Sequence, residues 1–93
     1  MKPECLSAEA VQRLLVPLTG WQVDDVELVK EFRFSTYLEG IDFVQRVAHL
    51  AEAMNHHPDL LVRWREVTVR LTTHSADGLT ALDFDLAGKI QAV

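Results

Sequence analysis

The segment from Thr36 to Asn55 carries the longest regular pattern in the sequence, with apolar side chains recurring at helical spacing. Thr36 followed by Glu39 fits a capping box, so a helix is predicted to begin there. The apolar positions form two stripes: Tyr37, Ile41, Val44, Ala48 and Ala51, and Phe43, Val47, Leu50 and Met54. Because one stripe is enough to cover a sheet, we expect the surplus to pack against another subunit. The alternative is a helix buried in a monomer, but a chain of 93 residues has little mass to cover it.

Two pairs of short segments with strand patterns flank helix 36–55. The first pair covers residues 21–23 and 26–34, with a turn expected at Asp24-Asp25. The second pair covers residues 59–64 and 67–74, where apolar side chains alternate with others along each segment. Each pair is therefore predicted to form an antiparallel hairpin.

Shorter helices are predicted at both ends of the chain. Ser7 can cap a helix over residues 7–20 that ends at Gly20, and Pro17 is expected to break its last turn. Thr80 and Asp83 have capping-box spacing at the start of the last helix. The order is helix, strand, strand, helix, strand, strand, helix. It predicts a two-layer α+β fold, with a four-stranded antiparallel sheet and three helices on one face.

The composition predicts one globular domain over residues 1–93. Apolar residues make up 48% of the chain and charged residues 25%, which argues against disorder. The net charge of −5 disfavours nucleic-acid binding, which needs a basic face. Cys5 is the one cysteine and suits a reducing compartment, and no stretch resembles a signal peptide or a membrane span. We therefore expect a cytoplasmic protein that binds neither nucleic acid nor membranes directly.

Three of the four histidines are predicted to meet at one corner. Pro58 biases His57 away from helical angles, so the long helix should end near His56 and the two imidazoles should diverge. If the second hairpin turns at Arg65-Glu66, the antiparallel register places His74 opposite His57.

Three kinds of chemistry fit such a corner. A metal site is disfavoured because adjacent histidines seldom reach one ion, and there is no HExxH motif and no cysteine pair. Histidine also suits the negative end of a helix dipole, which accounts for one histidine but not for His74. Proton transfer fits all three, since imidazole titrates near neutral pH. Glu52, one helical turn before His56, is expected to orient that ring, whereas His49 is expected to be a surface or structural residue. Ser75 adjoins His74, but nothing resembles a nucleophile elbow.

These residues resemble the signature of a known family, the pterin-4a-carbinolamine dehydratases, also called dimerization cofactors of a homeodomain transcription factor. The matching positions span residues 52 to 83 and are Glu52, His56-His57-Pro58, Trp64, His74 and Asp83. Gly20-Trp21 and the order of helices and strands also resemble the family, so the likeness covers most of the chain.

The resemblance implies a hydro-lyase. Such an enzyme removes water from 4a-hydroxytetrahydrobiopterin, the product of aromatic amino-acid hydroxylases, and yields the quinonoid dihydropterin for recycling. An acid must protonate the departing hydroxyl group and a base must take the N5 proton, and no metal or redox cofactor is expected. Neighbouring imidazoles suit this exchange.

The resemblance also implies a catalytic set. His56 and His74 would transfer protons, and His57 would bind the substrate and support charge. Asp83 would hold an imidazole in place, in addition to capping the last helix, and Glu52 would support His56.

Substrate-binding positions follow from the same resemblance. Thr72, Thr73 and His74 would offer backbone groups of an edge strand to the pterin ring. Trp64 and Trp21 would line the pocket, although burial in the core is an equally good expectation for both.

The resemblance implies an assembly as well: a homodimer joined through sheet edges, or a homotetramer joined through helix 36–55. A functional link to an aromatic amino-acid hydroxylase is expected. One alternative is a non-catalytic binding or dimerization protein of the same fold, such as a transcriptional coactivator. Another is a dehydratase-like protein of molybdopterin metabolism.

Overall fold

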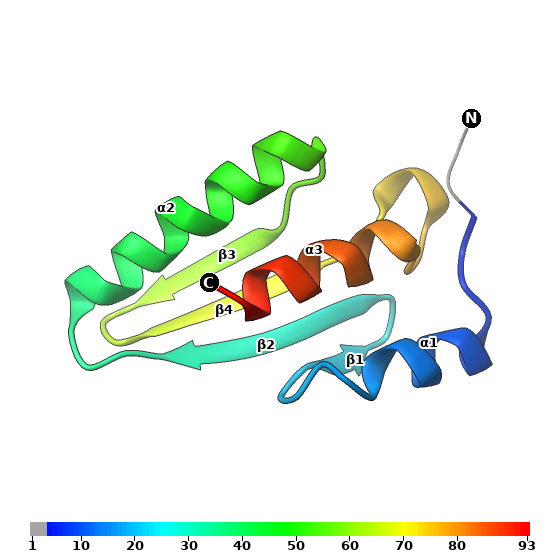
Figure 1. Ribbon diagram of the computed structural model, residues 1–93, viewed down its shortest axis with the longest axis horizontal. Helices are drawn as coiled ribbons and strands as arrows, with labels where there is room; N and C mark the ends of the chain where they lie inside the picture. The colour runs from blue at the N-terminus through cyan, green and yellow to red at the C-terminus, as the bar shows by residue number, and fades with distance from the viewer. Residues whose placement is uncertain (1–3) are drawn as a thin grey trace.

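The computed structural model describes residues 4–93 and confirms the predicted order of elements (Figure 1). Residues 1–3 lie outside the described part. They begin the segment that was searched for a signal peptide. The helices are α1 (Ala8–Leu15), α2 (Tyr37–Met54), α3 (Ala81–Gln91) and the short 3-10 helix η1 (His74–Ala76). The strands are β1 (Gln22–Asp24), β2 (Glu27–Arg33), β3 (Asp59–Arg63) and β4 (Glu66–Leu71).

The four strands form one antiparallel sheet in the order β1-β2-β4-β3, and the three helices lie on one face of it (Figure 1). Strands β2 and β4 are therefore internal, whereas β1 and β3 are the edges. The two-layer α+β architecture agrees with the sequence prediction.

The core lies between the sheet and the helices, where strand alternation sends every second side chain. Leu28, Val67, Val69 and Leu71 point inward from the sheet and are fully buried. Helices α2 and α3 supply the opposing layer with Phe43, Val47, Ala51, Phe84, Leu86, Ala87 and Ile90. Burying each large side chain contributes about 1.5–3 kcal/mol to folding.

Helix α2 begins as predicted but ends earlier. The Glu39 backbone N–H donates to Thr36 Oγ1 (3.2 Å) and the Thr36 N–H donates to Glu39 Oε1 (2.9 Å), which completes the capping box. The helix ends at Met54 because Asn55 adopts the left-handed conformation with φ of 49°. The end lies two residues before His56, close to the expected position, but Asn55 and not Pro58 ends the helix.

The two stripes of α2 have different surroundings. Phe43 and Val47 of one stripe are buried against the sheet, and Leu50 and Met54 are half-buried. In the other stripe Tyr37 is 48% exposed. Ile41 and Val44 are half-buried, Ala48 is exposed and only Ala51 is buried. Most of the second stripe thus remains at the surface, and its use as a subunit interface stays a prediction.

Helix α1 is shorter than the predicted segment 7–20. Ser7 Oγ accepts a hydrogen bond from the Ala10 N–H (3.1 Å), which confirms the cap. The helix ends at Leu15, ahead of Pro17, so the proline breaks the last turn as predicted. Gly20 does not end the helix; with φ of 87° it shapes the turn that leads into Trp21.

Both hairpin turns lie one residue away from their predicted positions. Asp24 pairs with Glu27, so the first turn is Asp25-Val26, and Asp25 has φ of 57°. Arg63 pairs with Glu66, so the second turn is Trp64-Arg65 instead of Arg65-Glu66.

The change in the second turn overturns the predicted register. Asp59 pairs with Arg70, and the same ladder would place Thr72, not His74, opposite His57. His74 lies beyond the strand, at the start of η1.

The helix-free face of the sheet carries charged pairs around Arg70. Its guanidinium group donates to Asp24 Oδ2 (3.0 Å) and Glu27 Oε1 (3.1 Å). The hydrogen bond to Asp24, followed by that to Glu27, raises the pKa of Arg70 above its ordinary value. Arg70 therefore links β4 to the residues around the first hairpin turn.

Candidate active site

A buried carboxylate lies at the start of α3. Asp83 is 0% exposed, and its Oδ2 accepts the Thr80 backbone N–H (2.9 Å) in the predicted capping box. Its Oδ1 lies 2.6 Å from Nε2 of His56, which is 8% exposed. A buried charge requires such partners, and the positive end of the helix dipole also favours a carboxylate at this position. Asp83 thus contacts an imidazole, as the family resemblance implied, and caps the helix, as its spacing from Thr80 predicted.

The left-handed residue that ends α2 turns His56 inward. The Asn55 N–H donates to the Glu52 carbonyl group (3.1 Å) and the His56 N–H donates to the Ala51 carbonyl group (3.0 Å), which is the pattern of a Schellman turn. The helical face that carries Glu52 therefore does not continue to His56.

His57 forms the second imidazole–carboxylate pair. Its Nε2 lies 2.5 Å from Glu52 Oε2, and both side chains are exposed. The expectation that Glu52 supports His56 is therefore wrong, because the chain leaves the helix before His56 and Glu52 reaches the next histidine. The two adjacent histidines diverge as predicted, one into the core and one toward solvent.

Thr73 contributes its side chain to the site. Its hydroxyl group donates to Asp83 Oδ2 (2.8 Å) and lies 2.8 Å from Thr80 Oγ1. Its backbone N–H donates to the Gly78 carbonyl group (3.1 Å), and its own carbonyl group accepts the Gly78 N–H (3.4 Å). The loop itself therefore pairs the backbone groups of Thr73, and the expectation that Thr73 offers them to a ligand stays a prediction.

Thr72 and His74 flank Thr73. Thr72 is half-buried, and its hydroxyl group donates to the Val26 carbonyl group (2.6 Å). The ladders of β4 with β2 and β3 end at Leu71 and Arg70, so residues 72–74 lie beyond both neighbouring strands, and their use by a ligand stays a prediction.

His74 is exposed, and no hydrogen bond or ion pair joins it to His56 or His57 within residues 4–93. His74 lies at this end of the sheet because its neighbour Thr73 contacts Asp83. Strand pairing does not place it there.

The two tryptophans lie elsewhere. Trp64 is 70% exposed at the β3–β4 turn, with the Arg65 guanidinium group 4.1 Å from its ring centre. At about 3.3 Å per residue, the strand separates it from His57 by roughly 20 Å. Trp21 is 4% exposed, and its Nε1 donates to Gln91 Oε1 (3.0 Å). Neither lines this site within one chain, and Trp21 belongs to the core.

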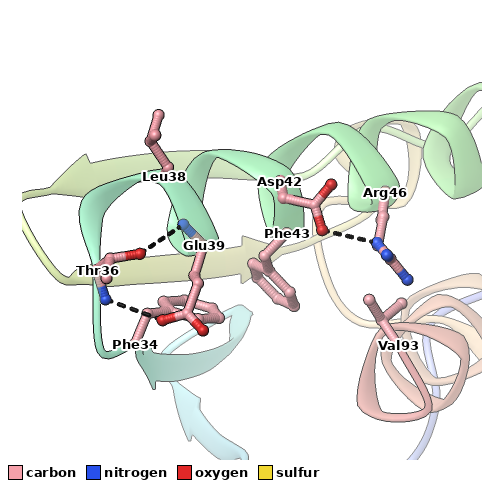
Figure 2. Close-up of a pocket in the computed structure, with 8 residues that line it drawn as sticks. All are labelled: Phe34, Thr36, Leu38, Glu39, Asp42, Phe43, Arg46 and Val93. Carbon is pink, nitrogen blue, oxygen red and sulfur yellow. Dashed lines mark hydrogen bonds and ion pairs between the residues drawn. The ribbon is translucent and has the colours of Figure 1, made fainter.

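Among the surface hollows of residues 4–93 outside the histidine corner are two of about 420 Å³ or more. One, of about 470 Å³, separates the first half of α2 from Val93 (Figure 2). Figure 2 shows Arg46 paired with Asp42 at its rim. The Arg46 Nε donates to Asp42 Oδ2 over 3.0 Å. The other, of about 420 Å³, adjoins the loop 77–79 that follows η1.

Within residues 4–93, no group of three or more histidine, cysteine, aspartate or glutamate side chains is arranged to hold a metal ion. None of the helices in this range has the length and apolar character needed to cross a membrane.

Sequence reasoning missed the side-chain role of Thr73. The signal that could have indicated it is the capping box of α3, which predicts a carboxylate at Asp83 that needs further donors.

Comparison with known proteins identifies relatives over nearly the whole chain. The model of the family described as pterin 4 alpha carbinolamine dehydratase matches residues 4–93. A protein of Roseiflexus sp. (strain RS-1), provisionally named a pterin-4-alpha-carbinolamine dehydratase, is 48% identical over 88 residues, 95% of each chain. A protein of Mycolicibacterium vanbaalenii with the same provisional name is 46% identical over the same shares.

Solved structures agree with this fold. A Brucella melitensis protein described as a transcriptional coactivator/pterin dehydratase superposes with a TM-score of 0.92 at 32% identity, covering 96% of this chain and 97% of that one. A pterin dehydratase-like protein identified as a RuBisCO assembly factor in the alpha-carboxysome gives a TM-score of 0.65 at 23% identity, covering 77% and 83%. At that identity the second likeness shows the fold alone.

Proposed function

Since this chain belongs to the pterin-4a-carbinolamine dehydratase family, we propose that it is a hydro-lyase that converts a 4a-hydroxytetrahydropterin into the quinonoid dihydropterin and water. The observation that supports this most is the pair of adjacent histidines, each held by its own carboxylate. One ring is buried and fixed, whereas the other is exposed and accessible to a ligand.

The reaction breaks the C4a–O bond and removes the N5 proton, so it needs a proton donor and a proton acceptor. General acid–base catalysis by positioned side chains contributes about 10²–10⁴-fold to a rate. We assign proton transfer to His56 and His74, and substrate binding and charge support to His57 with Glu52. His56 suits the first role because Asp83 fixes its ring.

The test is the rate of dehydration of 4a-hydroxytetrahydropterin, followed by absorbance in a stopped-flow instrument. We expect the chain to accelerate the reaction, and the double variant His56→Ala, His74→Ala to lose at least about 100-fold of that acceleration. His49→Ala is the matched control, because His49 is exposed on α2 and, within residues 4–93, makes no hydrogen bond or ion pair with His56, His57 or their carboxylates. Full activity in a folded double variant would contradict these roles.

We also propose that the protein is a cytoplasmic homo-oligomer that serves an aromatic amino-acid hydroxylase. Strand β3 is an open edge on which Leu61 is 52% exposed. Two copies of β3 pairing antiparallel about Leu61 would set Asp59 opposite Arg63 of the second copy. The same pairing would bring the second copy's Trp64 beside Pro58. That tryptophan would then lie close to the histidines of the first copy.

A non-catalytic binding role is the second candidate. The exposed Tyr37 and the 74% exposed Leu38 on α2 favour it, because apolar side chains of this size suit a protein partner. Purification from native extract distinguishes the two: a stoichiometric partner with no pterin turnover would favour binding. Turnover of a molybdopterin precursor in place of the tetrahydropterin would instead indicate a related dehydratase.

A further inference from the structure

Beneath the His56–Asp83 pair lie two buried hydroxyl groups for which the proposed dehydration has no use. Thr73 and Thr80 are buried, and their oxygens lie 2.8 Å apart. Thr73 also contacts Asp83 Oδ2 at 2.8 Å. Buried polar side chains beside a reacting residue commonly restrict its orientation and its protonation.

Helix capping does not explain Thr73. The capping box of α3 is complete with Thr80 and Asp83 alone, because each accepts a backbone N–H of the other. The Thr73 hydroxyl group donates to Asp83 in addition to this box and does not accept any N–H of α3. Its hydroxyl group therefore acts on the carboxylate and not on the helix.

The direction of these hydrogen bonds follows from counting protons. Thr80 Oγ1 already accepts backbone N–H groups of the first helical turn, so its own proton is free for Thr73 Oγ1. The Thr73 proton is then directed at Asp83 Oδ2, which also accepts the Thr80 N–H. The two hydroxyl protons and the Thr80 N–H therefore each have an acceptor when Asp83 is an unprotonated carboxylate.

That carboxylate has a consequence for His56. Asp83 Oδ1 is then an acceptor only, so the contact at 2.6 Å requires a proton on His56 Nε2. A neutral imidazole with its proton on Nε2 has a free lone pair on Nδ1.

We propose that Thr73, supported by Thr80, is a positioning residue that keeps Asp83 an acceptor, so that His56 retains its Nε2 proton and exchanges protons only at Nδ1. The use of Nδ1 on the substrate rests on the proposed dehydratase function. The tautomer of His56 does not, and it can be measured without any substrate.

The same residue also anchors His74. The backbone bridge of Thr73 with Gly78 closes the loop that begins at His74. One threonine therefore joins the fixed ring of His56 to the loop that carries the exposed histidine.

The test is ¹⁵N NMR of the histidine rings at a pH of about 9, where imidazole is neutral. In the wild type we expect His56 to be protonated at Nε2 with an unprotonated Nδ1. Thr73→Val keeps the shape of the side chain and removes its proton, so a share of the Nδ1-protonated tautomer should appear. The kcat for dehydration should fall about tenfold to a hundredfold, the range that a hydrogen bond to a charged group represents, with little change in KM.

Two further variants separate positioning from structure. Thr73→Ser retains the hydroxyl group and should restore both the tautomer and kcat. Thr68→Val, a buried threonine of β4 outside the network, should change neither. If Thr73→Val does not fold, Thr73→Cys, with a weak donor, provides the same comparison.

Two results would overturn the inference: a wild-type His56 protonated at Nδ1, or a folded Thr73→Val protein with the wild-type tautomer and kcat. If the wild type shows the expected tautomer but no dehydration, the positioning role stands and the proposed function fails.

Discussion

His56 differs from the other histidines because the carboxylate that holds its ring is buried. Its Nε2 faces the buried Asp83, whereas His57 pairs with Glu52 in solvent. Similar contacts in different surroundings have different energies. Removing one partner of a buried pair costs about 3–5 kcal/mol, but an exposed pair contributes about 0–1 kcal/mol.

Asp83→Asn should therefore abolish most activity without changing the shape of the site. The amide group cannot accept from both His56 and the Thr80 N–H, so the ring loses its fixed orientation. We expect kcat to fall about 10²–10⁴-fold. Stopped-flow rates with circular dichroism as the fold control measure this, and Asp85→Asn, an exposed change on the same helix, should leave the rate intact.

Glu52→Gln should have a smaller effect. The free energy of unfolding should change by less than about 1 kcal/mol, because the pair with His57 is exposed. The rate should fall by about tenfold at most, since the exposed ring keeps access to the substrate. Urea denaturation and steady-state kinetics check both values. A loss of rate as large as that of Asp83→Asn would contradict this assignment and would show that His57, not His56, transfers the proton.

At the scale of the elements, helix starts could be predicted and hairpin registers could not. The capping boxes at Thr36 and Thr80 are local spacings of three residues, which a sequence shows directly. The β3–β4 turn has no glycine or asparagine to fix its position. Moreover, the predicted and observed registers both keep Leu60 and Val62 on the helix side, so the apolar pattern fits either one.

The same hairpin explains which parts of the site sequence analysis missed. The histidine corner was predicted from a strand register that does not form. His74 lies at that end of the sheet because its neighbour Thr73 contacts Asp83. The partner of Glu52 was mistaken because helix α2 ends at a left-handed asparagine. A single residue with φ of 49° thus decides the direction of both His56 and His57.

Asn55 offers a direct test of that turn. Asn55→Gly should leave stability unchanged or raise it, because glycine adopts positive φ without strain. Asn55→Ala should lower the free energy of unfolding by about 1 kcal/mol, since alanine lacks the short polar side chain that lets asparagine adopt the left-handed conformation. Thermal denaturation of both variants measures the difference. Equal stabilities would mean that the left-handed turn does not end α2.

At the scale of the whole molecule, the sequence predicts the layers but not the assembly. Periodicity and order were enough for the two-layer fold, because each element has one apolar side to bury. The second apolar stripe of helix 36–55 indicates a contact surface, but neither it nor the exposed residues of β3 indicate which partner is bound or how many copies assemble.

Matched surface variants distinguish the two proposed interfaces. We expect the wild type to sediment as a dimer or tetramer at micromolar concentration. Leu61→Lys on the open edge should break a sheet-edge dimer, whereas Leu38→Lys on α2 should break only contacts between helices. Analytical ultracentrifugation measures both. A monomeric wild type, or an assembly that tolerates both changes, would contradict the proposed interfaces.

The most direct measurement of the central claim is a crystal structure of this protein with a bound dihydropterin. We predict that the pterin ring lies at the end of the sheet where Asp83 fixes His56, within hydrogen-bonding distance of His57 and His74. A pterin bound instead in the hollow between α2 and Val93 (Figure 2), with the histidines unoccupied, would contradict it.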